Sequence, residues 1–123
     1  MFREKDVSTR LIRPTIPEIH VEQLILFVQR WNPDWELDAS IQIFDEGIAQ
    51  YMLVDVESHY KYLAALILGK PSLRCRIVSD EPHDYLDDQA NNFTLIGNKL
   101  HHEDEVKLEH LKSILHKRGY RFN

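Results

Sequence analysis

The segment LRCRI, residues 73–77, alternates apolar and basic side chains without interruption. Leu73, Cys75 and Ile77 take one set of alternate positions, and Arg74 and Arg76 take the other. Successive side chains of a β-strand point to opposite faces of a sheet, so this period of two predicts a half-buried strand. One face would join a hydrophobic core, and the other would present two guanidinium groups.

Apolar periodicity and capping residues place the elements that precede this strand. Thr15-Ile16-Pro17 favours a helix start, and Asn32-Pro33 favours its end, because the residue before a proline avoids the helical region. Gly47 can close a short loop between two apolar stretches. Ser58 is a candidate cap for a second helix, which Gly69 ends. The expected elements are a helix ending near residue 31, a hairpin with strands at 41–44 and 48–56, and a helix over 58–68.

The C-terminal part of the chain adds a short strand at 93–96, a third helix over about 103–118, and a final strand or tail at 120–122. The resulting order, α-β-β-α-β-β-α, predicts an α+β fold: a mostly antiparallel sheet with about three helices on one face, in a two-layer sandwich. We expect a single domain over 1–123, with 1–13 as a mobile arm or an edge strand. One core is expected to contain Leu24, Val28, Val54, Leu63, Leu66, Leu73, Cys75, Ile77, Leu108 and Leu111.

Composition is that of an ordinary globular protein, with 43% hydrophobic and 28% charged residues among 123. The longest apolar run, at 63–68, is far shorter than the roughly 20 residues of a membrane span. The first ten residues do not have the pattern of a signal or transit peptide. Cys75 is the only cysteine, which excludes an internal disulfide and is consistent with a reducing compartment. We therefore interpret the chain as a cytoplasmic protein without membrane association.

Acidic residues are concentrated late in the chain. Between Asp80 and Glu109, nine acids and two bases give a formal charge of −7, while the whole chain carries −5. Residues 110–123 contain no acid and four bases. Five of the acids fall within 80–88, and mutual repulsion makes such a density unusual for a simple loop. The net negative charge disfavours general binding to nucleic acids, which depends on phosphate neutralisation.

Seven histidines are the best argument for an active or metal site. His83, His101 and His102 lie near acids, and imidazole with carboxylate is a common ligand set for transition metals. Their spacing matches no short metal-binding signature, so we expect no bound metal and no cofactor. A small hydrolase or nuclease that uses His83 or His101 with Asp84 or Asp104 is the alternative hypothesis for the function.

Other residue types with chemical potential have simpler interpretations. Asp45, Glu46, Asp55 and Glu57 are candidate carboxylates of a metal-dependent nuclease, but His59 stands where that motif would have a lysine and neither upstream acid has a compelling spacing. His20 and His59 fall in the first turns of helices, where a cationic ring is unfavourable, so we expect them to be neutral or exposed. Cys75 alternates inward with apolar neighbours and is expected to be a core residue.

Binding to another protein is the leading hypothesis, and an enzymatic role is less favoured. Opposed charges raise association rates, so the acidic segment would dock a basic protein partner. Tyr85 and Leu86 would supply an apolar anchor among these charges. An inhibitor, antitoxin or immunity-type protein would fit this size and charge. The expected partner-binding residues are Asp80, Glu81, Asp84, Tyr85, Leu86, Asp87 and Asp88.

Two further hypotheses remain open. A self-assembling structural protein would pair the acidic segment with the basic residues 110–123 of another copy, and its homo-oligomers would dissociate as salt rises. Contact with nucleic acid through Arg74, Arg76 and the basic C-terminus is the second, and the overall charge disfavours it.

Overall fold

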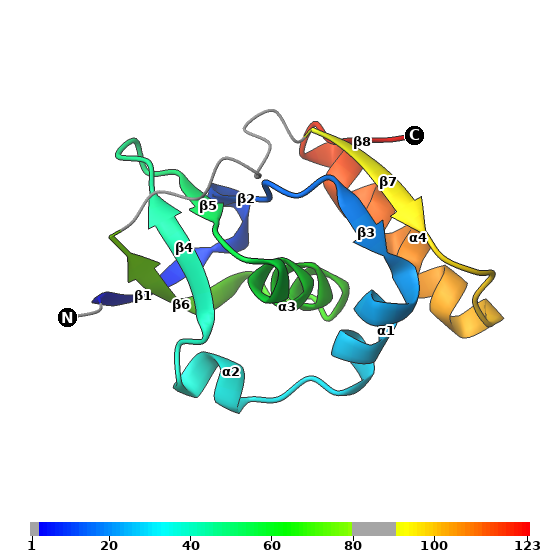
Figure 1. The fold of residues 1–123 in the computed structure, drawn as a ribbon, viewed down its shortest axis with the longest axis horizontal. Helices are drawn as coiled ribbons and strands as arrows, with labels where there is room; N and C mark the ends of the chain where they lie inside the picture. The colour runs from blue at the N-terminus through cyan, green and yellow to red at the C-terminus, as the bar shows by residue number, and fades with distance from the viewer. Residues whose placement is uncertain (1–2, 80–90) are drawn as a thin grey trace.

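A central helix lies between two β-sheets in the computed structural model, which describes residues 3–79 and 91–123 (Figure 1). This helix, α3 (Val56–Ile67), contacts a strand of the larger sheet on one side and two other helices on the other. The other helices are α1 (Val21–Gln29), the short α2 (Asp34–Leu37) and α4 (His102–Lys117), with a 3-10 turn at Thr9–Leu11.

The larger sheet has five strands in the order β1-β6-β4-β5-β2, and the smaller has the order β3-β7-β8. The larger sheet contains β1 (Arg3–Ser8), β2 (Ile12–Arg13), β4 (Ile41–Asp45), β5 (Tyr51–Leu53) and β6 (Ser72–Val78). The smaller sheet contains β3 (Glu18–His20), β7 (Asn92–Ile96) and β8 (Arg121–Phe122). The predicted α+β class is confirmed.

The predicted alternating strand is β6. Leu73, Cys75 and Ile77 are buried, while Arg74 and Arg76 lie half-buried on the other face. β6 pairs antiparallel with β1 and parallel with β4, so both of its edges are occupied. Residues 1–13 were expected to form a mobile arm or an edge strand. Within this range, β1 is an edge strand of the larger sheet and pairs with β6.

Strand directions differ from the expected mostly antiparallel sheet. Antiparallel pairing joins β1 to β6 and β4 to β5, whereas the β2–β5, β4–β6, β3–β7 and β7–β8 pairs are parallel. The reason is the path of the chain, because β4 turns back into β5 and α3 then carries the chain across to the far edge of β4. β6 therefore runs in the same direction as β4.

The presence of a second sheet also makes the structure different from the expected two-layer sandwich. Instead of one sheet covered by helices, α3 lies between the five-stranded sheet and a group formed by α1, α4 and the smaller sheet (Figure 1). A fourth helix, α2, follows Pro33, and the side-chain oxygen of Asn32 accepts the N–H of Asp34 at its start. The sequence has too few apolar residues there to predict that helix.

Element boundaries differ from the expected ones in three places. The second helix, α3, begins at Val56 and its N-cap is Asp55, because the Asp55 carboxylate accepts the N–H of Ser58, the residue expected to be the cap. The first helix begins at Val21 and not near Thr15-Ile16-Pro17, because residues 18–20 extend and pair with β7. The hairpin loop is longer than expected: Gly47 and Ala49 both have positive φ, so the chain turns there and β5 begins only at Tyr51. Ile48, expected in a strand, is 77% exposed.

One hydrophobic cluster contains buried residues from both sheets and from α1, α3 and α4. Of the ten residues expected in the core, all are buried except Val54, which is half-buried. Among the helices of the described residues, none combines the length and apolar character needed to cross a bilayer.

Candidate functional site

The residues predicted to bind a partner lie outside the described residues. They are Asp80, Glu81, Asp84, Tyr85, Leu86, Asp87 and Asp88. The segment that carries them follows β6 and precedes β7, so in the chain it connects the larger sheet to the smaller one.

Net charge is divided unequally between this segment and the rest of the protein. Residues 80–88 contain five acids and no lysine or arginine, and the whole chain carries −5. The remaining residues therefore sum to a formal charge of zero. The net charge of the protein is therefore equal to the charge of these nine consecutive residues, as expected for a chain whose charge is unevenly distributed.

The described histidines do not assemble a metal or catalytic site. His20, His101, His102, His110 and His116 are all exposed. No group of three or more His, Cys, Asp or Glu residues suited to holding a metal was found over 3–79 and 91–123. Of the proposed hydrolase pairs, His83 and Asp84 lie outside the described residues. Asp104, three residues after His101, pairs instead with Lys107 at 3.3 Å.

The carboxylates tested as a nuclease motif have structural partners. Asp55 caps α3 by accepting the N–H of Ser58, and Glu57 pairs with Lys61 at 3.4 Å. Glu46 makes a short ion pair with Arg13, 2.7 Å between Oε1 and Nη2. These contacts direct the three carboxylates to different places in the fold, which does not favour a shared metal.

Cys75 is fully buried, as expected for a core residue. Burial raises the pKa of its thiol to about 12, so the reactive thiolate is scarce at neutral pH. His59 is the one described histidine that is buried, and burial lowers its pKa to about 4. It is therefore neutral at physiological pH, in agreement with one of the two expectations for it.

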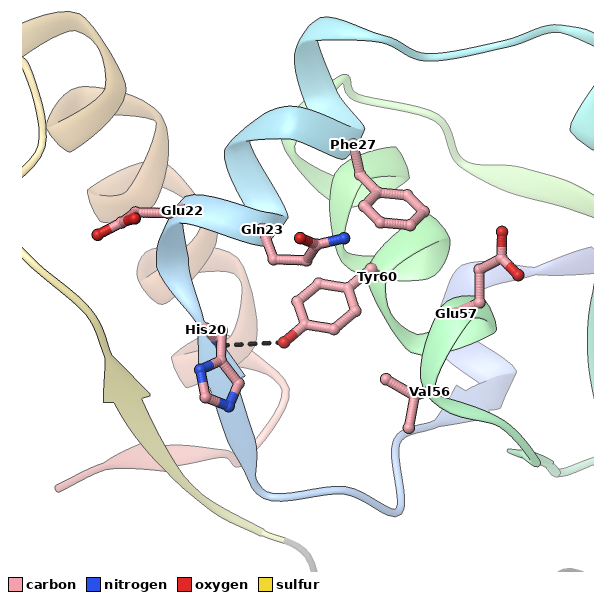
Figure 2. Close-up of a pocket in the computed structure, with 7 residues that line it drawn as sticks. All are labelled: His20, Glu22, Gln23, Phe27, Val56, Glu57 and Tyr60. Atoms are coloured by element: carbon pink, nitrogen blue, oxygen red, sulfur yellow. Dashed lines mark hydrogen bonds between the residues drawn. The ribbon is translucent and has the colours of Figure 1, made fainter.

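A hollow of about 720 Å³ opens between α1 and the first turns of α3, and we call it the α1–α3 hollow (Figure 2). Gln23 and Phe27 reach it from α1, and Val56 and Tyr60 reach it from α3. Spacings of four residues place each pair on one face of its helix. The complete lining is His20, Glu22, Gln23, Phe27, Val56, Glu57 and Tyr60.

Aromatic rings form one wall of this hollow. Phe27 and Tyr60 stack with ring centroids 5.6 Å apart and an interplanar angle of 23°. The Tyr60 hydroxyl accepts the backbone N–H of His20 at 3.0 Å, which fixes the ring against the start of α1 (Figure 2). Val56, 52% exposed, adds apolar surface at the opening. The wall is rigid and largely apolar, which suits an inserted side chain.

The charged side chains among the described lining residues are the carboxylates Glu22 and Glu57, and none is a lysine or an arginine. Glu22 points away from the other side chains in Figure 2 and accepts the backbone N–H of Asn98 at 3.1 Å. Glu57 has a side chain 64% exposed to solvent, and within 3–79 and 91–123 its one ion pair is with Lys61 on its own helix. Glu57 is thus the carboxylate of the lining that is exposed enough to bind a cationic group of a ligand.

Chemically, the α1–α3 hollow is suited to binding more than to catalysis. Among the described residues of its lining there is no serine, threonine, cysteine or lysine that could act as a nucleophile. Within the described residues neither carboxylate is hydrogen-bonded to the imidazole of His20, so the lining shows no acid–base pair.

Sequence reasoning assigned no role to His20 and did not single out Phe27 or Tyr60. The four-residue spacings of Gln23 with Phe27 and of Val56 with Tyr60 were a usable signal, since they place each pair on one face of its helix, with Tyr60 at the edge of the core. Which faces meet depends on packing between segments far apart in the chain. Comparison with protein-family models, curated proteins and solved structures finds no match.

Proposed function

We propose that this protein is a non-enzymatic binding protein that docks a basic protein partner through its acidic 80–88 segment. The observation that carries the proposal is the division of charge: the net −5 falls within that segment and the rest of the chain is neutral. A local negative potential of this kind steers a basic partner and raises the association rate.

The α1–α3 hollow is proposed as the anchoring site for a side chain of the same partner. Its stacked Phe27 and Tyr60 offer an aromatic surface, and Glu57 offers a carboxylate at the opening. An arginine or lysine side chain can place its apolar stem on such rings and its charge near the carboxylate. Charge complementarity therefore favours a basic side chain as the occupant.

Inhibitors, antitoxins and immunity proteins are the functional classes that this proposal includes. Such proteins act by covering a target, which requires a rigid scaffold and complementary charge but no catalytic residues. We propose a cytoplasmic location as well, because the lone Cys75 is a buried thiol, as proteins in reducing compartments commonly have.

The test begins with the full-length protein as bait in a lysate of its native host, with mass spectrometry to identify captured proteins. Binding of the purified partner is then compared with that of a Val56→Arg variant. Val56 is half exposed, so the fold should tolerate this change, while a cation at the opening should weaken binding about tenfold or more.

Leu68→Arg is the matched control, because Leu68 is 44% exposed at the other end of α3 and does not line the hollow. Equal affinity of the wild type and the Val56→Arg variant for the partner would mean that the α1–α3 hollow is not the anchoring site. Partners that are acidic, or affinity that does not change with salt, would contradict the proposed function itself.

A further inference from the structure

A second cleft, of about 380 Å³, has the opposite electrostatic character. It lies where the turn after β1 meets the C-terminal ends of α3 and α4. Four basic residues line it, Arg10, Lys70, Lys117 and Arg118, and none of the described residues of the lining is an acid. We call it the basic cleft. In a chain with an excess of acids, such a concentration of cations needs an explanation.

Arg118 is held in place by the fold. Its Nη1 atom donates to the carbonyl of Thr9 at 3.2 Å and to the hydroxyl of Tyr62 at 3.3 Å, and Nη2 donates to Thr9 Oγ1 at 3.3 Å. A guanidinium has five N–H donors. Within 3–79 and 91–123, these bonds leave Nε and one N–H of Nη2 without an acceptor. That edge is the one that arginine uses to bind an oxyanion with two parallel bonds.

The other cations are only partly neutralised. Lys70 pairs with Glu36 at 3.1 Å, with both side chains partly exposed. Lys117 and Arg10 are exposed and make no ion pair to any described acid. The clustered positive charge is therefore directed at solvent in the cleft.

Helix dipoles account for only part of this charge. The C-termini of α3 and α4 each contribute about half a negative charge, which attracts cations. Their last carbonyls are already bonded, however: Lys70 N–H donates to Ala65 and Tyr120 N–H donates to Leu115. Among the residues that the structure describes, Glu36 and the two half-charges offset about two of the four positive charges, which leaves roughly two uncompensated.

We propose that the basic cleft binds the phosphate group of a small phosphorylated molecule. A dianion would compensate the remaining charge, and the fork of Arg118 with the flexible ammonium of Lys117 suits tetrahedral oxygens. The cleft volume falls within the range of small-molecule sites. The cleft shares no lining residue with the α1–α3 hollow, and its proposed ligand does not depend on the proposed partner.

Calorimetric titration at constant ionic strength tests the site, with inorganic phosphate, pyrophosphate and sulfate as probes. Lys117→Gln and Arg10→Gln each remove an exposed cation from the lining, and the fold should tolerate both. Each variant should weaken pyrophosphate binding about tenfold, since a charge-assisted contact is lost. Lys112→Gln is the matched control, because Lys112 lies on the same helix outside the cleft and pairs with Glu109.

Saturable binding of phosphate or pyrophosphate that is weakened about tenfold in each of the two cleft variants and unchanged in Lys112→Gln would support the proposal. No saturable binding, or an equal loss in all three variants, would overturn it. A short phosphoserine peptide, titrated in parallel, identifies the source of the phosphate: tighter binding than pyrophosphate would assign the site to a phosphorylated polypeptide. Sedimentation of the same samples should give an unchanged mass, because the ligand is small.

Discussion

The Nε2 atom of His59 accepts a hydrogen bond from the backbone N–H of Thr15 at 2.8 Å. The N–H of Ile16 approaches the same atom at 3.2 Å. On the other side of the ring, Nδ1 lies 2.6 Å from the carbonyl of Asp55, which can only accept, so Nδ1 carries the proton. The neutral ring thus joins the start of α3 to the segment before β3, across more than forty residues of chain.

Stability is expected to fall in mild acid because of this ring. Burial lowers the pKa of His59 from 6.5 to about 4. Between those values the unfolded chain binds a proton that the folded protein does not, so folding free energy is lost as pH falls from about 6.5 to 4. The full loss is on the order of 3 kcal/mol. Urea unfolding at pH 7 and pH 5 should detect about 2 kcal/mol of this loss, because pH 5 lies only part of the way from 6.5 to 4.

His59→Gln is the control for that experiment. Its side-chain oxygen can reach the position of Nε2 and accept the Thr15 N–H, but it does not titrate. This variant should be less stable at pH 7, since the bond to Asp55 is lost, and its stability should change less between pH 7 and pH 5. An equally steep pH dependence in the variant would assign the acid sensitivity to other groups.

Leu66→Ala should destabilise the protein by about 2–5 kcal/mol, because Leu66 is only 3% exposed and its removal leaves a cavity in the central helix. Leu68→Ala, two residues later and 44% exposed, should change the free energy of unfolding by less than about 0.5 kcal/mol. Chemical denaturation of both variants provides the comparison, and similar losses would mean that α3 is not packed as described.

Local patterns explain which parts of the fold could be predicted. The alternation at 73–77 and the leucines of α4 each indicate, within one segment, which face is buried. The predicted bounds of both elements agree with the observed bounds to about one residue. Strand β3 has no such pattern. Residues 18–20 extend because they pair with β7, more than seventy residues later, and that pairing overrides the helix signal of Pro17.

The candidate sites depend even more on such distant contacts. Charge could be read from the sequence, so the acidic 80–88 segment was predicted from residue types alone. The α1–α3 hollow and the basic cleft could not be predicted, because each forms where segments far apart in the chain meet. Arg10 and Lys117 line one cleft where Arg118 binds Thr9, and nothing in the local sequence around either residue indicates that contact.

Gly97→Ala should cost more stability than the same change at Gly69. Gly97 has a φ of +139°, and a Cβ atom there would lie 2.8 Å from Cγ2 of Val21, a buried side chain at the start of α1. Gly69 also has positive φ, but a Cβ atom there meets nothing within 4 Å. We expect a loss of about 1 kcal/mol at Gly69 from backbone strain alone and about 2–3 kcal/mol at Gly97. Thermal unfolding of the two variants would contradict this ranking if their losses were equal.

Binding of the basic partner should separate into a steering step and an anchoring step. Replacing Asp84, Asp87 and Asp88 with Asn removes three of the five charges of the acidic segment, and should slow association more than it speeds dissociation. Raising the salt concentration should have the same effect, since the screening length is about 8 Å at physiological ionic strength. Tyr85→Ala should instead speed dissociation, because an aromatic anchor acts after the complex has formed.

Kinetic binding measurements at two salt concentrations distinguish these effects. A matched control is the Glu103→Gln and Glu109→Gln double variant, which removes acids from α4 and leaves residues 80–88 unchanged. That control should retain most of the wild-type association rate, because the net charge outside the acidic segment is close to zero and its field falls off within the screening length. Unchanged affinity in both the Asn variant and Tyr85→Ala would mean that the acidic segment is only a solvated connection between β6 and β7, and the proposed function would then be wrong.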